Sequence, residues 1–213
     1  MRITKFGHAC VRVDHAGIRV VLDPGSFTGR EAVEGADVVL ITHQHADHYD
    51  ADHLRATSAQ IHTIGDVADV IREEAPDLVD RLHVVTPGDT LDVGLPVRVV
   101  GDKHAVIHPD YPRIHNSGYL LDLAGTKVYH PGDSLTGPGE PVDLLLAPVS
   151  APWLKVGEAV DFVREVAAPR TLAIHDRVHS EVGLAMVETH MNNLALGDGR
   201  TFVRLADGAD LDL

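Results

Sequence analysis

The chain contains a single cysteine, Cys10, so it cannot form an intrachain disulfide. A chain without disulfides is compatible with a reducing compartment. Cys10 lies in the apolar segment Ala9–Val13, where a small buried strand residue is the favoured interpretation over a reactive thiol. A cysteine-based mechanism is therefore set aside.

Basic residues are also scarce, with 18 Lys and Arg against 32 Asp and Glu and a formal net charge of −14. Proteins that bind an extended nucleic acid normally present clustered cations that replace the phosphate counterions. The charge balance therefore disfavours an extended nucleic-acid partner and favours a small-molecule substrate.

Long apolar runs are missing as well. No uninterrupted run approaches the ~20 residues that cross a bilayer, and Met1–Phe6 lacks the apolar core of a secretory signal. We therefore expect a cytoplasmic protein without a membrane partner, and a homo-oligomer is compatible with the sequence. A length of 213 residues suits one core of ordinary size, which predicts a single domain over residues 1–213.

Short apolar runs alternate with helical patterns along the chain. Strands are expected at Arg2–Lys5, Cys10–Val13, Arg19–Leu22, Val38–Ile41, Val97–Val100, Thr126–Tyr129, Thr171–Ile174 and, at an edge, Thr201–Leu205. Helices are expected after Asp50, over Asp66–Arg72, over Val156–Ala167 and over Glu181–Leu196, the last with Leu184, Val187, Met191 and Leu194 in the core. The residues alone therefore predict an α/β protein.

What the sequence has in abundance is histidine, with 15 residues. Most of them must be structural or exposed, and His53, His62 and His179 are expected at the surface. One segment differs: Thr42–His48 reads T-H-x-H-x-D-H and directly follows the apolar run Ala36–Ile41. Such a loop, at the carboxyl end of a buried strand, is where α/β layers usually place their chemistry.

Imidazoles with a carboxylate suit zinc, while additional oxygen ligands admit manganese or iron. His43 and His45 are two residues apart and can converge from an extended segment, whereas Asp47 and His48 lie where the chain can turn toward a second ion. Further candidates stand at the ends of other expected strands, namely His104, Asp133 and His175.

At this point the chain resembles the metallo-β-lactamase superfamily of metal-dependent hydrolases, and in particular its short branch of L-ascorbate-6-phosphate lactonase-like proteins. Shorter similarities lie in Phe6–Ala9, Leu22–Pro24 and Ala147–Val149. The resemblance covers nearly the whole chain and implies a four-layer αβ/βα sandwich with the ligand loops along one edge.

The resemblance also implies a complete set of metal ligands. One divalent ion would be held by His43, His45 and His104, a second by Asp47, His48 and His175, and Asp133 would bridge them. The third histidine has three candidates, because His104, His108 and His115 all lie between Asp102 and Ser117. His104 is favoured since it stands nearest the preceding strand.

Residues beside these ligands have weaker signals. His8 and Asp23 are candidates to orient ligand histidines through hydrogen bonds, or else a strand-end residue and a turn residue. His130 precedes the Pro-Gly turn that carries Asp133, but the alternation of a strand can equally point it into the protein. Trp153, Tyr119 and Asn116 are candidates for a pocket, although such aromatics are more often core or rim residues.

The chemistry expected from such a centre is hydrolysis. Two divalent ions about 3.5 to 4 Å apart lower the pKa of a shared water toward ~7 and hold the resulting hydroxide for attack on a carbonyl or phosphoryl centre. Asp47 or Asp133 would orient the nucleophile and handle its proton. Small esters, lactones, amides and phosphodiesters are all compatible substrates.

A second class of function stays open at this point. A metal-binding sensor, or an inactive relative with a structural metal site, would have the same ligands without turnover. Hydrolysis of a broad substrate panel distinguishes the two classes.

Overall fold

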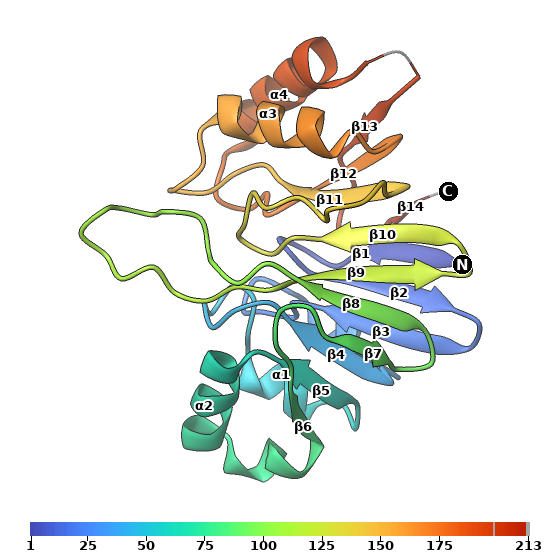
Figure 1. The fold of residues 1–213 in the computed structure, drawn as a ribbon, viewed down its shortest axis with the longest axis vertical. Helices are drawn as coiled ribbons and strands as arrows, with labels where there is room; N and C mark the ends of the chain where they lie inside the picture. Colours follow the sequence, from blue (N-terminus) through green and yellow to red (C-terminus); the bar gives the residue numbers. More distant parts are fainter. Residues whose placement is uncertain (198, 212–213) are drawn as a thin grey trace.

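The structure, a computed structural model, describes residues 1–197 and 199–211. Within these residues two seven-stranded sheets form the centre of the molecule (Figure 1). The first sheet, in spatial order, consists of β14 (Asp210–Leu211), β1 (Arg2–Lys5), β2 (Val11–His15), β3 (Ile18–Leu22), β4 (Val38–Ile41), β5 (Gln60–Thr63) and β6 (Leu82–Val84). The second consists of β13 (Thr201–Val203), β12 (Arg170–Ile174), β11 (Leu144–Pro148), β10 (Thr126–His130), β9 (Gly118–Leu123), β8 (Pro96–Val100) and β7 (Thr90–Asp92).

Helices cover the outer face of each sheet (Figure 1). Residues of α1 (Ala51–Arg55) and α2 (Gly65–Glu74) pack in one apolar cluster with the first sheet. Residues of α3 (Val156–Val166) and α4 (Glu181–His190) do the same with the second sheet. A third cluster fills the space between the sheets, so the expected four-layer αβ/βα sandwich is confirmed. The shorter turns are η1 (Arg30–Val33), η2 (Pro76–Arg81) and η3 (Met191–Ala195).

Strand β4 shows why its sequence is continuously apolar. Val38 and Leu40 face the cluster between the sheets, whereas Val39 and Ile41 face the cluster beneath α1 and α2. Side chains alternate between the two faces of a strand, and here both faces are buried. A strand of this kind requires apolar residues at every position.

The two sheets share a pattern that places their carboxyl ends at one edge. β3, β4, β5 and β6 are parallel neighbours in the first sheet, as are β10, β11, β12 and β13 in the second. Loops leaving the ends of parallel strands gather at one side of a sheet. The loops after β3, β4, β10 and β12 carry Asp23, His43, Asp133 and His175, respectively.

Most of the elements expected from the sequence are present. The turn at Ala16 and Gly17 joins β2 to β3, with both residues at positive φ and His15 paired with Ile18, as a two-residue hairpin requires. Asp50 caps α1 by accepting a hydrogen bond from the backbone of Asp52, and β13 is an edge strand. The buried strands β9 and β11 were not expected, because their apolar residues lie among turn-forming neighbours.

Two expectations are wrong. Leu194 is 49% exposed because α4 continues into the π-helical turn η3, which shifts later residues off the spacing of 3.6 per turn. His53 is only 5% exposed, since it lies on the inner side of α1 close to Asp50. Within the described part of the chain, no helix combines the length and apolar character needed to span a bilayer.

A buried tyrosine joins the two sheets directly beneath the His43 loop. The Tyr119 hydroxyl, at the start of β9, donates to the carbonyl of Ile41 at 2.9 Å. The backbone N–H of Ser117 donates to the Thr42 carbonyl at 3.0 Å. Burial raises the pKa of the Tyr119 phenol well above its usual value, so it remains a donor. These contacts fix the position of the His43 loop relative to the second sheet.

Tyr119→Phe tests this link. The variant should lose about 1 kcal/mol of unfolding free energy, because it removes one buried donor while Thr63 Oγ1 still donates to the same Ile41 carbonyl. Urea unfolding, with the metal content held equal, measures the difference. Tyr111→Phe, at a side chain that is 67% exposed, is the matched control, and equal stability of the two variants would contradict the assignment.

Candidate metal centre

The first group of candidate ligands gathers around the end of β4. His43, His45, His104 and Asp133 offer one nitrogen or oxygen atom each, and these atoms all lie within 4.8 Å of one another. His43 Nε2 is 2.9 Å from His45 Nδ1. Burial, followed by the charge of His48, lowers the pKa of His43 well below its usual value. His43 is therefore a neutral imidazole, the form that binds metals.

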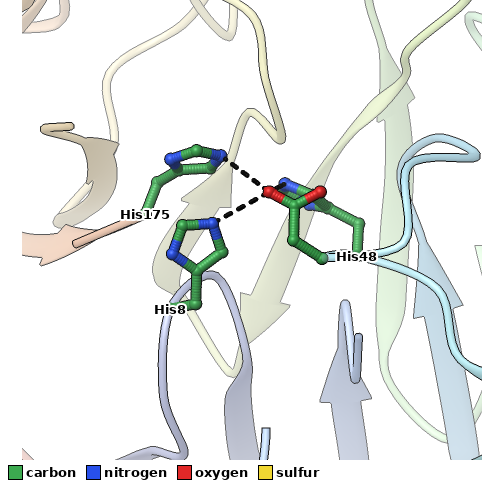
Figure 2. Close-up of side chains that lie close together, drawn as sticks. His8, His48 and His175 are labelled. Atoms are coloured by element: carbon green, nitrogen blue, oxygen red, sulfur yellow. Dashed lines mark hydrogen bonds and ion pairs between the residues drawn. The ribbon is translucent and has the colours of Figure 1, made fainter. Parts of the chain in front are cut away.

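The second group lies beside the first and contains His8, Asp47, His48 and His175, again with all candidate atoms within 4.8 Å. Figure 2 shows His8 and His175 directed at one carboxylate oxygen, with His48 behind it. That oxygen is Asp47 Oδ2, 3.0 Å from His8 Nε2 and 3.3 Å from His175 Nε2. The two histidines and the carboxylate thus converge from three different segments of the chain.

A turn in the ligand loop separates the two groups. The backbone N–H groups of His48 and Tyr49 both donate to the carbonyl of His45 at 3.0 Å. This turn brings a ring nitrogen of His48 into the second group, while the His48 ring stays next to His43, with ring centroids 4.1 Å apart. The expectation that the chain turns toward a second site after His45 therefore agrees with the backbone.

Asp133 lies between the groups. Its side chain is 2% exposed, and its oxygens lie 3.3 Å from His104 Nε2, 3.2 Å from His175 Nε2 and 3.1 Å from His48 Nε2. His104 belongs to the first group and the other two histidines to the second. The carboxylate is thus positioned to serve both groups at once.

Two of the candidate ligands are oriented by one buried carboxylate. Asp23 accepts from the Thr42 backbone N–H at 2.8 Å, from Thr42 Oγ1 at 2.7 Å and from His48 Nδ1 at 2.7 Å. Because the Thr42 hydroxyl donates to Asp23, its oxygen accepts from His43 Nδ1 at 3.0 Å. We assign both rings from these partners: Nδ1 carries a proton, and Nε2 faces the centre.

Backbone carbonyls orient two others in the same way. His104 Nδ1 donates to the carbonyl of Ala105 at 2.6 Å, and His175 Nδ1 donates to the carbonyl of Ser150. A carbonyl can only accept, so Nδ1 is the protonated nitrogen in each ring. Hydrogen bonds of this kind fix the tautomer and direction of metal-binding histidines.

The atoms left without partners test whether the residues fit a metal. Among the described residues, His48 Nε2, His104 Nε2, His175 Nε2 and Asp133 Oδ1 are buried side-chain atoms without a hydrogen bond. They lie close together, but their directions do not suit hydrogen bonds to each other. Buried polar atoms are rarely unpaired in native proteins. Their convergence on a common space fits divalent ions held by nitrogen and oxygen ligands.

The charges of the side chains in the centre also favour a divalent metal ion. Burial raises the pKa of Asp133, but the charges of His48 and His175 outweigh it, and the pKa lies well below the usual carboxyl value. Burial lowers the pKa of His175, whereas Asp133 raises it, to about 9 overall. The buried carboxylate therefore favours a positive charge near the Nε2 atoms of these histidines. Either protons or metal ions can supply that charge.

Two further buried histidines have the opposite orientation. The Arg177 backbone N–H donates to His8 Nδ1 at 3.2 Å, and the Gly132 backbone N–H donates to His130 Nδ1 at 3.0 Å. In a neutral ring the other nitrogen then carries the proton. His8 Nε2 donates it to Asp47, and His130 Nε2 donates it to the Ala9 carbonyl at 2.9 Å. His8 therefore holds Asp47 in place, and His130 is a structural residue.

The backbone at the centre is unusual at three of these residues. His8, Asp23 and His175 have φ values of 47°, 46° and 54°, in the left-handed region that residues other than glycine seldom adopt. Such a conformation costs on the order of 1 kcal/mol and clusters at functional sites. Asp23 and His175 directly follow β3 and β12, and His8 lies in the turn between β1 and β2.

Two glycines permit close approach of backbone at the centre. A Cβ on Gly25 would lie 2.0 Å from the Asp47 carbonyl carbon, and one on Gly132 would lie 2.4 Å from Asn116 Oδ1. Gly25 lets the Asp23 turn pack against the ligand loop. Gly132, at a φ of +62°, lets the Asp133 turn pack against Asn116.

The structure brings together all seven residues that the sequence suggested as ligands. It also separates the candidates for the third histidine: His104 is 1% exposed at the centre, whereas the side chains of His108 and His115 are 59% and 50% exposed. Two residues that the sequence suggested only as pocket candidates, Trp153 and Asn116, form hydrogen bonds with Asp133. Trp153 Nε1 donates to Asp133 Oδ2 at 3.1 Å, and Asn116 Oδ1 accepts from the Asp133 backbone at 2.9 Å.

The orientation of His8 leads to a test by metal titration. His8→Ala should still bind two ions per chain, with the affinity of the weaker site reduced about 10- to 100-fold, as is typical when the partner of a ligand is removed. His175→Ala should lose one ion. His8→Gln, which can present an amide donor to Asp47, should recover part of the affinity. Loss of one ion from His8→Ala at saturating metal would instead make His8 a ligand.

Comparison with known proteins agrees with this geometry. A family model described as a beta-lactamase superfamily domain matches residues 2–175. Protein Rv0786c from Mycobacterium tuberculosis is 41% identical over 182 residues, which cover 84% of this chain and 85% of that protein. A UPF0173 metal-dependent hydrolase from Thermococcus onnurineus is 29% identical over 165 residues, covering 70% and 72%.

A solved structure shows the same fold. The metallo-beta-lactamase fold protein YhfI from Bacillus subtilis superposes with a TM-score of 0.71 at 15% identity, over 99% of this chain and 98% of that one. At this identity the likeness concerns the fold alone. The family is shown by the family model, which matches most of the chain, and by the 41% identical relative. The chain belongs to the metallo-β-lactamase superfamily.

Proposed function

We propose that the protein is a metal-dependent hydrolase that acts on a small ester, lactone, amide or phosphodiester. The observation that carries this proposal is the set of unpaired Nε2 atoms of His48, His104 and His175 around the buried Asp133 carboxylate. Relatives are named metal-dependent hydrolases. The short L-ascorbate-6-phosphate lactonase-like branch is the part of the superfamily in which we place the chain.

The ligand assignment follows the two groups. We propose that His43, His45 and His104 hold one divalent ion, that Asp47, His48 and His175 hold the other, and that Asp133 contacts both. Five imidazoles and two carboxylates, without a thiolate, favour zinc, with manganese and iron as the alternatives. Bound ions would supply an activated water and a Lewis acid for the developing oxyanion.

The two candidate carboxylates, Asp47 and Asp133, have different roles in this proposal. Asp133 is 2% exposed, whereas the Asp47 side chain is 22% exposed, so Asp47 is the carboxylate that a substrate or water can reach. We assign Asp47 to orient the attacking water and accept its proton, within hydrogen-bond reach of the reacting group. His8 keeps Asp47 Oδ2 in position through its Nε2 proton. Trp153 Nε1 donates a hydrogen bond to Asp133 Oδ2 and so restrains that carboxylate.

The proposed partner is a small molecule. The acidic net charge of −14 supports neither an extended nucleic acid nor an anionic membrane surface as a partner. We also propose that the protein forms a homo-oligomer and is located in the cytoplasm. Sedimentation measures the oligomeric state, and cell fractionation measures the location.

Asp133→Ala tests the proposed function directly. The metal-loaded wild-type protein should hydrolyse at least one member of a panel of esters, lactones, amides and phosphodiesters. Asp133→Ala should lose both metal and turnover, with activity at least about 100-fold lower, the lower end of what a catalytic carboxylate contributes. Asp161→Ala, at an exposed position of α3, is the control.

Two outcomes would contradict the proposal. Full activity of Asp133→Ala with both metals retained would remove Asp133 from the centre. A wild-type protein that binds two ions and changes conformation, yet hydrolyses nothing in the panel with any of the three metals, would be a sensor or an inactive relative.

A further inference from the structure

A long irregular loop stands beside the first group of ligands. Residues 101–117, between β8 and β9, contain no helix or strand, and Figure 1 shows this loop, in green, extending away from the sheets. Connections longer than about 12 to 15 residues without regular structure are uncommon in compact domains and are usually functional. His104 lies in this loop, so whatever the loop contacts is close to the metal centre.

The base of the loop is fixed while its outer part extends outward. The His104 backbone N–H donates to the Ile114 carbonyl at 3.1 Å, and Arg113 Nε donates to the His104 carbonyl at 2.6 Å. The Ala105 backbone N–H donates to the Asp133 carbonyl at 2.7 Å. These bonds join the two limbs of the loop to each other and to the turn that carries Asp133.

The outer part of the loop exposes large apolar side chains. Val106 is 54% exposed, Ile107 is 43% exposed and Tyr111 is 67% exposed. Single exposed apolar residues are ordinary, but a group of them beside a functional site indicates a binding surface. These three side chains line one cavity together with two of the candidate ligands.

A cavity of about 240 Å³ connects this apolar group to the ligands. His45 and His104 contribute to its wall, together with the apolar side chains of Ala105, Val106, Ile107, Tyr111, Pro112 and Ile114, and His108 and Arg113 complete it. Pockets that enclose a whole small ligand measure about 300 to 1,000 Å³. The cavity therefore suits one substituent of a substrate whose reacting group lies over the metal centre.

Trp153 is a further aromatic side chain beside the candidate ligands. Its ring lies edge-on to His104, with centroids 5.5 Å apart, and to His175, with centroids 6.2 Å apart. The indole ring is thus a second apolar surface beside two of the candidate ligands. Such surroundings favour an apolar group over a charged one, because a charge would lose its hydration there.

We propose that the substrate carries an apolar substituent, an alkyl, acyl or aryl group, and that Val106, Ile107 and Tyr111 select it. This inference rests on the proposed hydrolysis and narrows its substrate class. The substituent occupies the cavity beside His45 and His104, and the bond to be cleaved lies over the two ligand groups, within reach of Asp47. A second copy of the chain could also cover exposed apolar residues, but it would not explain a cavity that reaches two candidate ligands.

The test measures binding, so it does not depend on turnover. A series of n-alkylphosphonates, from methyl to hexyl, is titrated calorimetrically into the metal-loaded protein, with the phosphonate as a group that metals bind. Affinity should rise about fourfold per methylene, the value expected for burying one methylene, until the cavity is full. The Ile107→Ser/Tyr111→Ser variant should lose most of this dependence while retaining two ions per chain and binding methylphosphonate as the wild type does.

The control is Val182→Ser/Met186→Ser. These residues of α4 are 72% and 60% exposed and do not line the cavity, so the variant should retain the wild-type dependence on chain length. Absence of binding, equal affinity across the series, or an unchanged dependence in the loop variant would overturn the inference. So would a loop variant that changes only the oligomeric state measured by sedimentation, since the loop would then be an interface between copies.

The failures of the two proposals are distinguishable. If affinity follows chain length but the protein hydrolyses nothing in the substrate panel, the apolar site stands and hydrolysis fails. If the protein hydrolyses members of the panel without preference for apolar substituents and the phosphonates bind equally, hydrolysis stands and the apolar site fails.

Discussion

The rest of the centre depends on one buried carboxylate, Asp133, which must be surrounded by positive charge or hydrogen-bond donors. A carboxylate with 2% exposure is costly unless positive charge or hydrogen bonds surround it. Here it has one hydrogen bond from the Trp153 indole and three imidazole nitrogens nearby, from His48, His104 and His175. The two candidate metal groups are arranged around this oxygen pair, so the position of Asp133 determines how they can act together.

The fold delivers these groups from distant parts of the sequence. Parallel strands in both sheets end at the same edge, and the ligand-bearing loops leave from those ends. Contacts between the sheets then fix their separation, with Tyr119 of β9 bonded to the Ile41 carbonyl of β4. Hydrogen bonds at Nδ1 orient the rings of His43, His48, His104 and His175 from outside. A well-packed support of this kind is what keeps a metal centre in one geometry.

The sequence was sufficient for the fold class and for the ligand candidates. The T-H-x-H-x-D-H spacing is local, and the strand before it is apolar throughout, so both can be identified without knowledge of the fold. His104 was preferred over His108 on its distance from a strand, and the structure buries the first and exposes the second. The fold class and the ligand candidates could be read from the sequence because both depend on patterns among neighbouring residues.

Other features of the centre depend on tertiary contacts and could not be predicted. The partners that orient His104 and His175 are backbone carbonyls of Ala105 and Ser150, which have no sequence signature. The positive φ values of His8, Asp23 and His175 occur without glycine. Trp153 reaches Asp133 from the loop that leads into α3, a pairing that follows from the packing of the second sheet and not from residue spacing.

The most direct test of this account is anomalous X-ray diffraction from crystals of the metal-loaded protein, recorded at the absorption edge of the bound metal. Two separate peaks are expected on either side of Asp133, one bounded by His43, His45 and His104 and the other by Asp47, His48 and His175. A single peak at full metal loading, or peaks that lie away from Asp133, would contradict it.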